Sequence, residues 1–121
     1  MKPLLCLALL CLAACGSSSL LEEGRWTGAL TPMNHPDMAN PVAYDVSYDG
    51  DALAIDLIGP GGAAVPTRDV RLANGTLYFT FDEPEEGVAL DCALGSIDGG
   101  FSGRCTAPDG KWARFTMRPP E

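Results

Sequence analysis

The sequence contains few of the residues that most often carry chemistry. It has one histidine, His35, and its 16 acidic residues outnumber its 8 lysines and arginines, which gives a net charge of −8. A surface this acidic repels nucleic-acid phosphates and anionic lipid headgroups, so we expect no nucleic-acid partner. No Gly-x-Ser-x-Gly elbow is present. A hydrolytic triad would have to combine His35 with Ser47, Ser96 or Ser102, so we expect neither enzymatic activity nor a cofactor.

No apolar run is long enough to remain in a membrane. The longest run covers residues 4–14 and follows Lys2, whereas a membrane-spanning helix needs about 20 apolar residues. Its length and its small residues at the C-terminal end are typical of a cleaved secretory signal. The run ends in Leu12-Ala13-Ala14-Cys15, and these four residues resemble the lipobox of bacterial lipoproteins.

The lipobox resemblance implies that residues 1–14 are a signal peptide and that Cys15 carries lipid at the mature N-terminus. The alternative is a plain secreted protein in which Cys15 is incidental. Residues 15–23 would then form a Ser-rich tether, and residues 24–119 a single domain held at a membrane of the bacterial cell envelope. Gly16, in place of an aspartate, favours the outer membrane or cell surface if the cell is Gram-negative, and the choice of membrane stays open.

The cysteine count agrees with an oxidising compartment. Of the five cysteines, two lie in the leader and Cys15 is the lipidation candidate, which leaves Cys92 and Cys105. A two-residue turn at residues 98–99 places them opposite each other in a hairpin, so we expect a disulfide. The rival interpretation, a metal site built on the two thiols, lacks further ligands nearby in the sequence.

Beyond Gly24 the apolar residues alternate with period two, and tight turns recur every 8 to 12 residues. The pattern predicts an all-β domain of about eight antiparallel strands joined as a meander. Such a sheet forms a small closed or partly open β-barrel, with a β-sandwich as the alternative. Five strands are expected at 25–31, 42–48, 51–58, 67–73 and 76–82, and three more flank residues 98–99 and 107–111.

The turns also predict which residues pair. The turns at residues 49–50 and 74–75 and the acidic loop 82–87 set the first pairs: Val46 with Leu53, Tyr44 with Ile55, Leu72 with Leu77, Val70 with Phe79, Phe81 with Val88 and Phe79 with Leu90. A three-residue loop with a bulge at Gly110 sets the last pairs: Cys105 with Ala113, Gly103 with Phe115 and Phe101 with Met117.

Gly24-Arg25-Trp26 resembles the Gly-x-Trp that opens the first strand of lipocalins and related calycin barrels. The resemblance implies that an arginine of the last strand, Arg118 or the less well placed Arg114, lies across the tryptophan. It also implies a carrier of a small apolar ligand, with Trp26, Tyr44 and Arg118 as candidate ligand or barrel-end residues. From the residues alone, Trp26 can instead plug one end of a small barrel with a packed interior.

The longest stretch without alternation, residues 32–41, contains the only histidine. Met33, His35, Asp37 and Met38 could together bind a soft or borderline metal such as copper. Two thioethers and one imidazole match no defined ligand spacing, so we favour a proline-bounded surface loop.

The sequence thus predicts a lipid-anchored envelope domain that acts as a non-enzymatic binding or interaction module. Its partners would be the membrane, through the N-terminal lipid, and an envelope protein or a small apolar ligand. The alternatives are a carrier of a small apolar ligand and a copper-handling protein.

Overall fold

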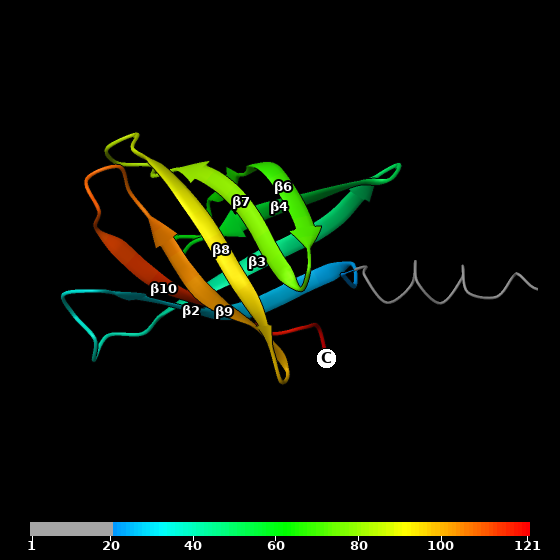
Figure 1. Ribbon diagram of the computed structural model, residues 1–121, viewed down its shortest axis with the longest axis horizontal. Helices are drawn as coiled ribbons and strands as arrows, with labels where there is room; N and C mark the ends of the chain where they lie inside the picture. The colour runs from blue at the N-terminus through cyan, green and yellow to red at the C-terminus, as the bar shows by residue number, and fades with distance from the viewer. Residues whose placement is uncertain (1–20) are drawn as a thin grey trace, which may run out of the picture.

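The computed structural model describes residues 21–121, which form nine antiparallel strands and contain no helix (Figure 1). The strands are β2 (Gly24–Pro32), β3 (Asn40–Asp49), β4 (Ala52–Ile58), β5 (Ala64–Pro66), β6 (Arg68–Ala73), β7 (Thr76–Asp82), β8 (Ala89–Ile97), β9 (Gly100–Thr106) and β10 (Trp112–Met117). Within this part of the chain there is accordingly no helix able to span a membrane. The leader and Cys15 lie outside the described residues.

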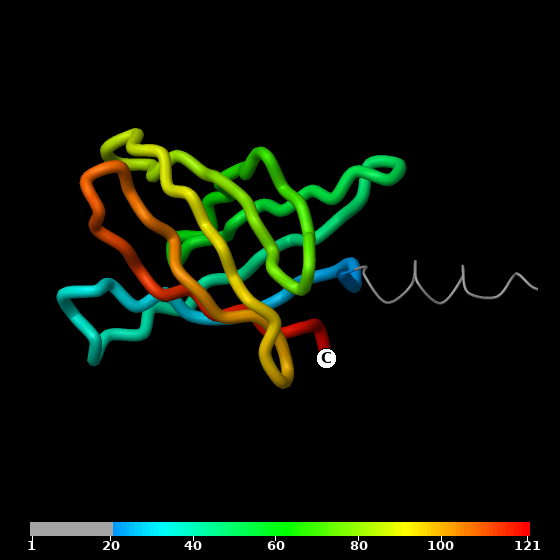
Figure 2. Tube along the Cα trace, in the orientation of Figure 1, coloured from blue at the N-terminus to red at the C-terminus, as the bar shows by residue number. Residues whose placement is uncertain are grey.

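The strands follow one another around a nearly closed barrel, in the order β5-β4-β3-β2-β10-β9-β8-β7-β6. Each strand pairs with its neighbour in the sequence, except β5 with β6, and β2 meets β10 (Figure 2). The predicted all-β meander and its barrel are therefore confirmed, with one strand more than expected. The additional strand is β5, which lies between the strands expected at 51–58 and 67–73 and pairs Val65 with Leu57.

The ring of hydrogen bonds is interrupted between β5 and β6, and we call this interruption the seam. Thr67 connects the two strands, and its Oγ1 donates to the Ile55 carbonyl oxygen of β4 at 2.6 Å. Pro66 has no N–H with which to continue a ladder. β5 and β6 are therefore joined at the seam by the chain itself, through Thr67, and the Thr67 side chain extends the contact of this segment with β4.

The two ends of the barrel differ in their connections (Figure 1). The closed end carries the tight turns at residues 50–51, 74–75 and 98–99, and both Leu21 and the C-terminus lie there. The open end carries the four longer loops, residues 33–39, 59–63, 83–88 and 107–111.

Aromatic and aliphatic side chains fill the closed end. Leu21, which was expected in the tether, is only 5% exposed and belongs to the core. Trp26 Nε1 donates to the Glu22 carbonyl oxygen at 2.8 Å, and the Tyr48 hydroxyl donates to the Leu21 carbonyl oxygen at 2.7 Å. The Trp26 ring lies 6.0 Å from that of Phe101. The folded domain therefore begins at least three residues before the expected boundary at Gly24.

Two predicted registers are wrong by two residues. Tyr44 pairs with Leu57 rather than Ile55, because the hairpin loop is Gly50-Asp51, with Gly50 at a φ of 65°. Phe81 pairs with Leu90 rather than Val88.

The acidic loop causes the second shift, because it closes on itself. The Glu83 N–H donates to the Val88 carbonyl oxygen at 2.8 Å, and the Gly87 N–H donates to the Glu83 carbonyl oxygen at 2.7 Å. A shift of two leaves every side chain on its predicted face, so the expected core survives both errors.

The last two hairpins pair as predicted, and the β6–β7 hairpin does so next to its turn. Leu72 lies opposite Leu77, and the β8–β9 and β9–β10 pairs have the predicted partners throughout. The Cys92–Cys105 disulfide is confirmed and joins β8 to β9.

Candidate functional site

An apolar cavity of about 300 Å³, here called the mouth cavity, opens between the loops of the open end. Leu57, Phe81 and Phe115 are buried side chains in its lining. The full lining is Leu30, Asn40, Pro41, Val42, Leu57, Gly59, Pro60, Val65, Phe81, Glu83, Pro84, Leu90, Cys105, Ala113 and Phe115. Only Asn40 and Glu83 among these have polar side chains, so the cavity favours an apolar guest.

The mouth cavity arises from small or rigid residues at the strand ends. Ala113 and Val65 place short side chains inward at the open end, whereas Trp26 and Phe101 fill the closed end with rings. Three prolines, at positions 41, 60 and 84, stand on the rim and carry no N–H. An apolar molecule at the rim therefore leaves few main-chain donors without a partner.

The residues expected at a ligand do not line this cavity. Trp26 is 5% exposed and plugs the closed end, and Tyr44 is fully buried. The Tyr44 hydroxyl donates to the Thr116 carbonyl oxygen at 2.7 Å, and burial raises the pKa of this hydroxyl well above its usual range.

Arg118 is exposed, and its main chain pairs with that of Thr27. Within residues 21–121 the cation–π contacts are Arg71 over Tyr78 and Arg104 over Trp112, and neither involves Arg118. The arginine that the calycin resemblance implies across Trp26 is thus not in that position, and Arg114 is likewise exposed on the barrel exterior.

The loop expected as the weak metal candidate is an exposed turn. The His35 N–H donates to the Pro32 carbonyl oxygen at 3.1 Å, and the Met38 N–H donates to the His35 carbonyl oxygen at 3.0 Å. Met33 and Met38 are 40% and 48% exposed, and Asp37 is exposed as well. In the described part of the chain no three His, Cys, Asp or Glu side chains gather as metal ligands.

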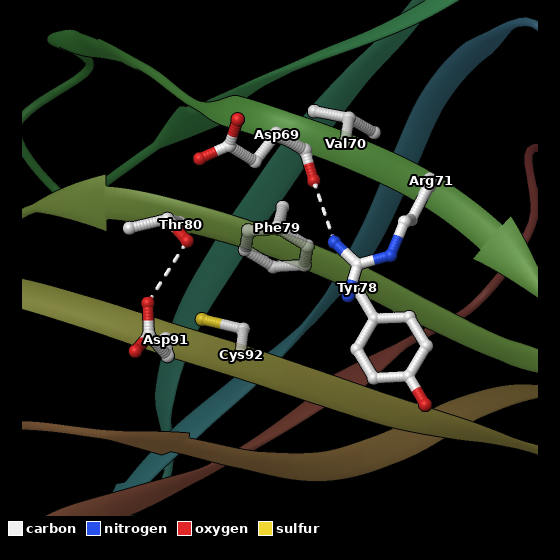
Figure 3. Close-up of a pocket in the computed structure, with 8 residues that line it drawn as sticks. All are labelled: Asp69, Val70, Arg71, Tyr78, Phe79, Thr80, Asp91 and Cys92. Carbon is white, nitrogen blue, oxygen red and sulfur yellow. Dashed lines mark hydrogen bonds between the residues drawn. The ribbon is translucent and has the colours of Figure 1, made fainter.

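A second depression of about 550 Å³, the outer hollow, lies over β6, β7 and β8 (Figure 3). β6 bulges between Arg68 and Arg71, where Asp69 has a φ of 56°, so the predicted pairing of Val70 with Phe79 is wrong. The Thr80 hydroxyl bonds Asp91 at 3.0 Å, and Arg71 reaches the Asp69 carbonyl oxygen at 3.5 Å.

Two hydrogen bonds thus link polar groups within the outer hollow. Across residues 21–121 no buried side-chain nitrogen or oxygen lacks a hydrogen-bond partner. We assign this depression no function.

Comparison with known proteins supports the architecture. No protein-family model and no curated protein matches the chain. Among solved structures, a redesigned beta barrel is similar to it, with a TM-score of 0.62 and 15% identity, over 82% of this chain and 91% of that chain. At this identity the likeness shows the fold alone. Fold and cavity together define a small β-barrel consistent with a binding-type module.

Proposed function

We propose that this chain is a lipid-anchored binding protein of the bacterial cell envelope, whose mouth cavity holds a small apolar molecule or the apolar part of a larger one. The mouth cavity carries the proposal, because it is a concave, almost wholly apolar site of the kind that small ligands occupy. The lipobox residues 12–15 support the anchor.

The position of Leu21 supports a particular orientation. Leu21 packs into the closed end, and six residues from Cys15 to residue 20 span at most about 22 Å. An anchored domain would therefore stand with its closed end toward the membrane and its mouth facing away. Ligand exchange would then take place with the envelope space or with a partner, and not with the supporting bilayer.

The cavity volume limits the guest. An apolar cavity of about 150 Å³ holds benzene, so about 300 Å³ accommodates roughly 12 non-hydrogen atoms. At about 0.5 kcal/mol per atom the binding free energy is about −6 kcal/mol, or a Kd of roughly 40 µM. A longer guest would extend past the proline rim.

Fluorescence titration with the neutral probe N-phenyl-1-naphthylamine, whose rings would extend past the proline rim, tests the cavity. In a Cys15→Ser background, which removes the lipidation site, the probe should bind saturably. Ala113→Phe places a ring in the cavity and should weaken binding at least about tenfold. Ala93→Phe is the matched control, because Ala93 is exposed on β8 and does not line the cavity. This variant should bind the probe as tightly as the parent. Equal binding by both variants would refute the cavity as the site.

Metabolic labelling with palmitate tests the anchor separately. The unmodified chain should incorporate label and require detergent for extraction, whereas Cys15→Ser should do neither. Failure to label would remove the anchor and leave the proposed ligand site unaffected.

A further inference from the structure

Two arginines face each other on the outer surface of the barrel. Arg104 of β9 and Arg114 of β10 are direct partners in the ladder, and both are exposed. Their neighbours Cys105 and Phe115 point inward into the core. Like charges placed directly opposite each other destabilise a sheet, so this pair opposes the stability of the fold.

No acidic side chain compensates the pair. The ion pairs within residues 21–121 are Arg25–Asp45, Arg68–Asp82 and Lys111–Asp109. Asp91, an acidic neighbour on β8, instead accepts a hydrogen bond from Thr80. In a chain with twice as many acidic as basic residues, an uncompensated pair of arginines is unexpected, and the fold gives no reason for it.

An aromatic ring and a hollow adjoin the two arginines. The Arg104 guanidinium lies 4.1 Å from the centre of the Trp112 ring. A depression of about 360 Å³ beside it is lined by Thr31, Pro32, Met33, Pro36, Trp112 and Arg114. We call Arg104, Trp112, Arg114, Met33 and Pro36 the Arg-Trp face. Tryptophan, arginine and methionine are enriched where protein interfaces gain most of their binding energy.

We propose that the Arg-Trp face binds an acidic segment of a partner protein that presents an apolar side chain between its carboxylates. Each guanidinium offers a planar fork of donors that fits a carboxylate. The hollow between Trp112, Met33 and Pro36 receives the apolar side chain. Because this face lies on the outside of β9 and β10 and the mouth cavity on the inside, the two sites are independent.

Two other occupants have matching charge. The acidic loop of a second copy, residues 82–87, carries four carboxylates, and a free phosphate also suits an arginine pair. A partner segment fits better than phosphate, since phosphate leaves the apolar hollow empty. The acidic loop of a second copy fits less well than a partner segment. Pro84 and Gly87 are its only residues without a carboxylate, and neither has a large apolar side chain to fill the hollow.

Nuclear magnetic resonance can follow binding at the two tryptophans. The ¹⁵N-labelled Cys15→Ser chain is titrated with the peptide acetyl-Gly-Glu-Phe-Glu-Glu-Gly-amide. The Trp112 indole N–H should shift saturably, and the Trp26 indole, buried at the closed end, should not. A peptide with glutamine for each glutamate should bind at least about tenfold more weakly.

Variants assign the effect to the face. Arg104→Gln and Arg114→Gln should each weaken binding about tenfold, and neither endangers folding, because each relieves a like-charge contact. Arg71→Gln is the matched control: Arg71 lies 4.4 Å from the centre of the Tyr78 ring but has no facing arginine, so binding should be unchanged.

Three results would overturn the proposal. The first is an unmoved Trp112 indole, or equal shifts with both peptides. The second is inorganic phosphate binding as tightly as the acidic peptide, which would make the face a simple anion site. The third is self-association in sedimentation velocity that both Arg114→Gln and Glu85→Gln abolish, which would make the second copy the occupant. A chain that stays monomeric and binds the acidic peptide more tightly than the glutamine peptide supports a partner segment as the occupant.

Discussion

The substitution Tyr44→Phe tests how the barrel is closed between β2 and β10. These strands pair from Ala113–Pro32 to Phe115–Leu30 and again at Thr27–Arg118. Between the two stretches, Thr116 of β10 makes two other hydrogen bonds, one through its side chain and one with a tyrosine of β3. Its Oγ1 accepts from the Ala29 N–H at 3.0 Å, and its carbonyl oxygen accepts from the Tyr44 hydroxyl at 2.7 Å.

The expected loss of stability follows from the burial of Tyr44. Phenylalanine keeps the ring but leaves the Thr116 carbonyl oxygen without its donor, at a cost of about 2 kcal/mol. For a domain of this size that lowers Tm by about 10 °C and the urea midpoint by about 1 M.

Urea unfolding followed by circular dichroism measures the effect, and Tyr48→Phe is the control. The Tyr48 hydroxyl makes a bond of the same length to the Leu21 carbonyl oxygen, but Tyr48 is only partly buried. Water can replace its hydroxyl, so the expected cost is about 0.5 kcal/mol. The reasoning is refuted if Tyr44→Phe costs less than about 0.5 kcal/mol, or if Tyr48→Phe costs as much.

A pH series adds a second readout. Burial raises the pKa of Tyr44 above its ordinary 10.0, so the folded state holds the proton where the unfolded chain releases it. The contribution is fully present below about pH 10 and declines as the pH rises further toward the folded pKa. The stability of Tyr44→Phe should therefore fall less steeply above pH 10 than that of the parent.

Three other changes test the packing, each by urea or thermal unfolding. Gly28→Ala should cost more than about 3 kcal/mol, because its Cβ would lie 1.8 Å from a β10 carbonyl oxygen. Gly95→Ala, whose nearest contact is 3.9 Å, should cost less than about 1 kcal/mol, and equal effects would contradict the close approach. Replacing Cys92 and Cys105 with alanine should cost about 3 kcal/mol and abolish sensitivity to dithiothreitol; an unchanged Tm argues against a structural disulfide. Leu21→Ala should lower the free energy of unfolding by about 2 to 3 kcal/mol. Unchanged stability would show that Leu21 contributes nothing to the core at the closed end.

The sequence predicted faces more reliably than registers. The two-residue turn predicted at residues 98–99 is the one observed, so the partners of Cys92 and Cys105 were correct. At residues 49–51 the loop can shift along the chain, and a shift of two keeps Val46 and Tyr44 inward. Alternation cannot detect such an error, because it records only odd and even positions. β5 escaped prediction because three residues are too few to show a period.

The candidate sites were harder to predict than the fold. The predicted turns paired Leu90 with Phe79 and Phe115 with Gly103, but the mouth cavity depends on how distant loops meet above Leu90 and Phe115. The Gly-x-Trp resemblance directed attention to Trp26, at the opposite end. The facing arginines could have been found, because the predicted pairing of Cys105 with Ala113 already implies them.

At the seam, no ladder of main-chain hydrogen bonds joins β5 to β6. A ring that is bonded all the way round has a diameter fixed by strand number and stagger. Here β5 and β6 are instead joined by one residue, Thr67, whose Oγ1 bonds the Ile55 carbonyl oxygen of β4. Val65 and Leu57 stand beside that gap and also line the mouth cavity. On this side the wall of the mouth cavity is therefore completed by the covalent chain and not by a ladder of hydrogen bonds.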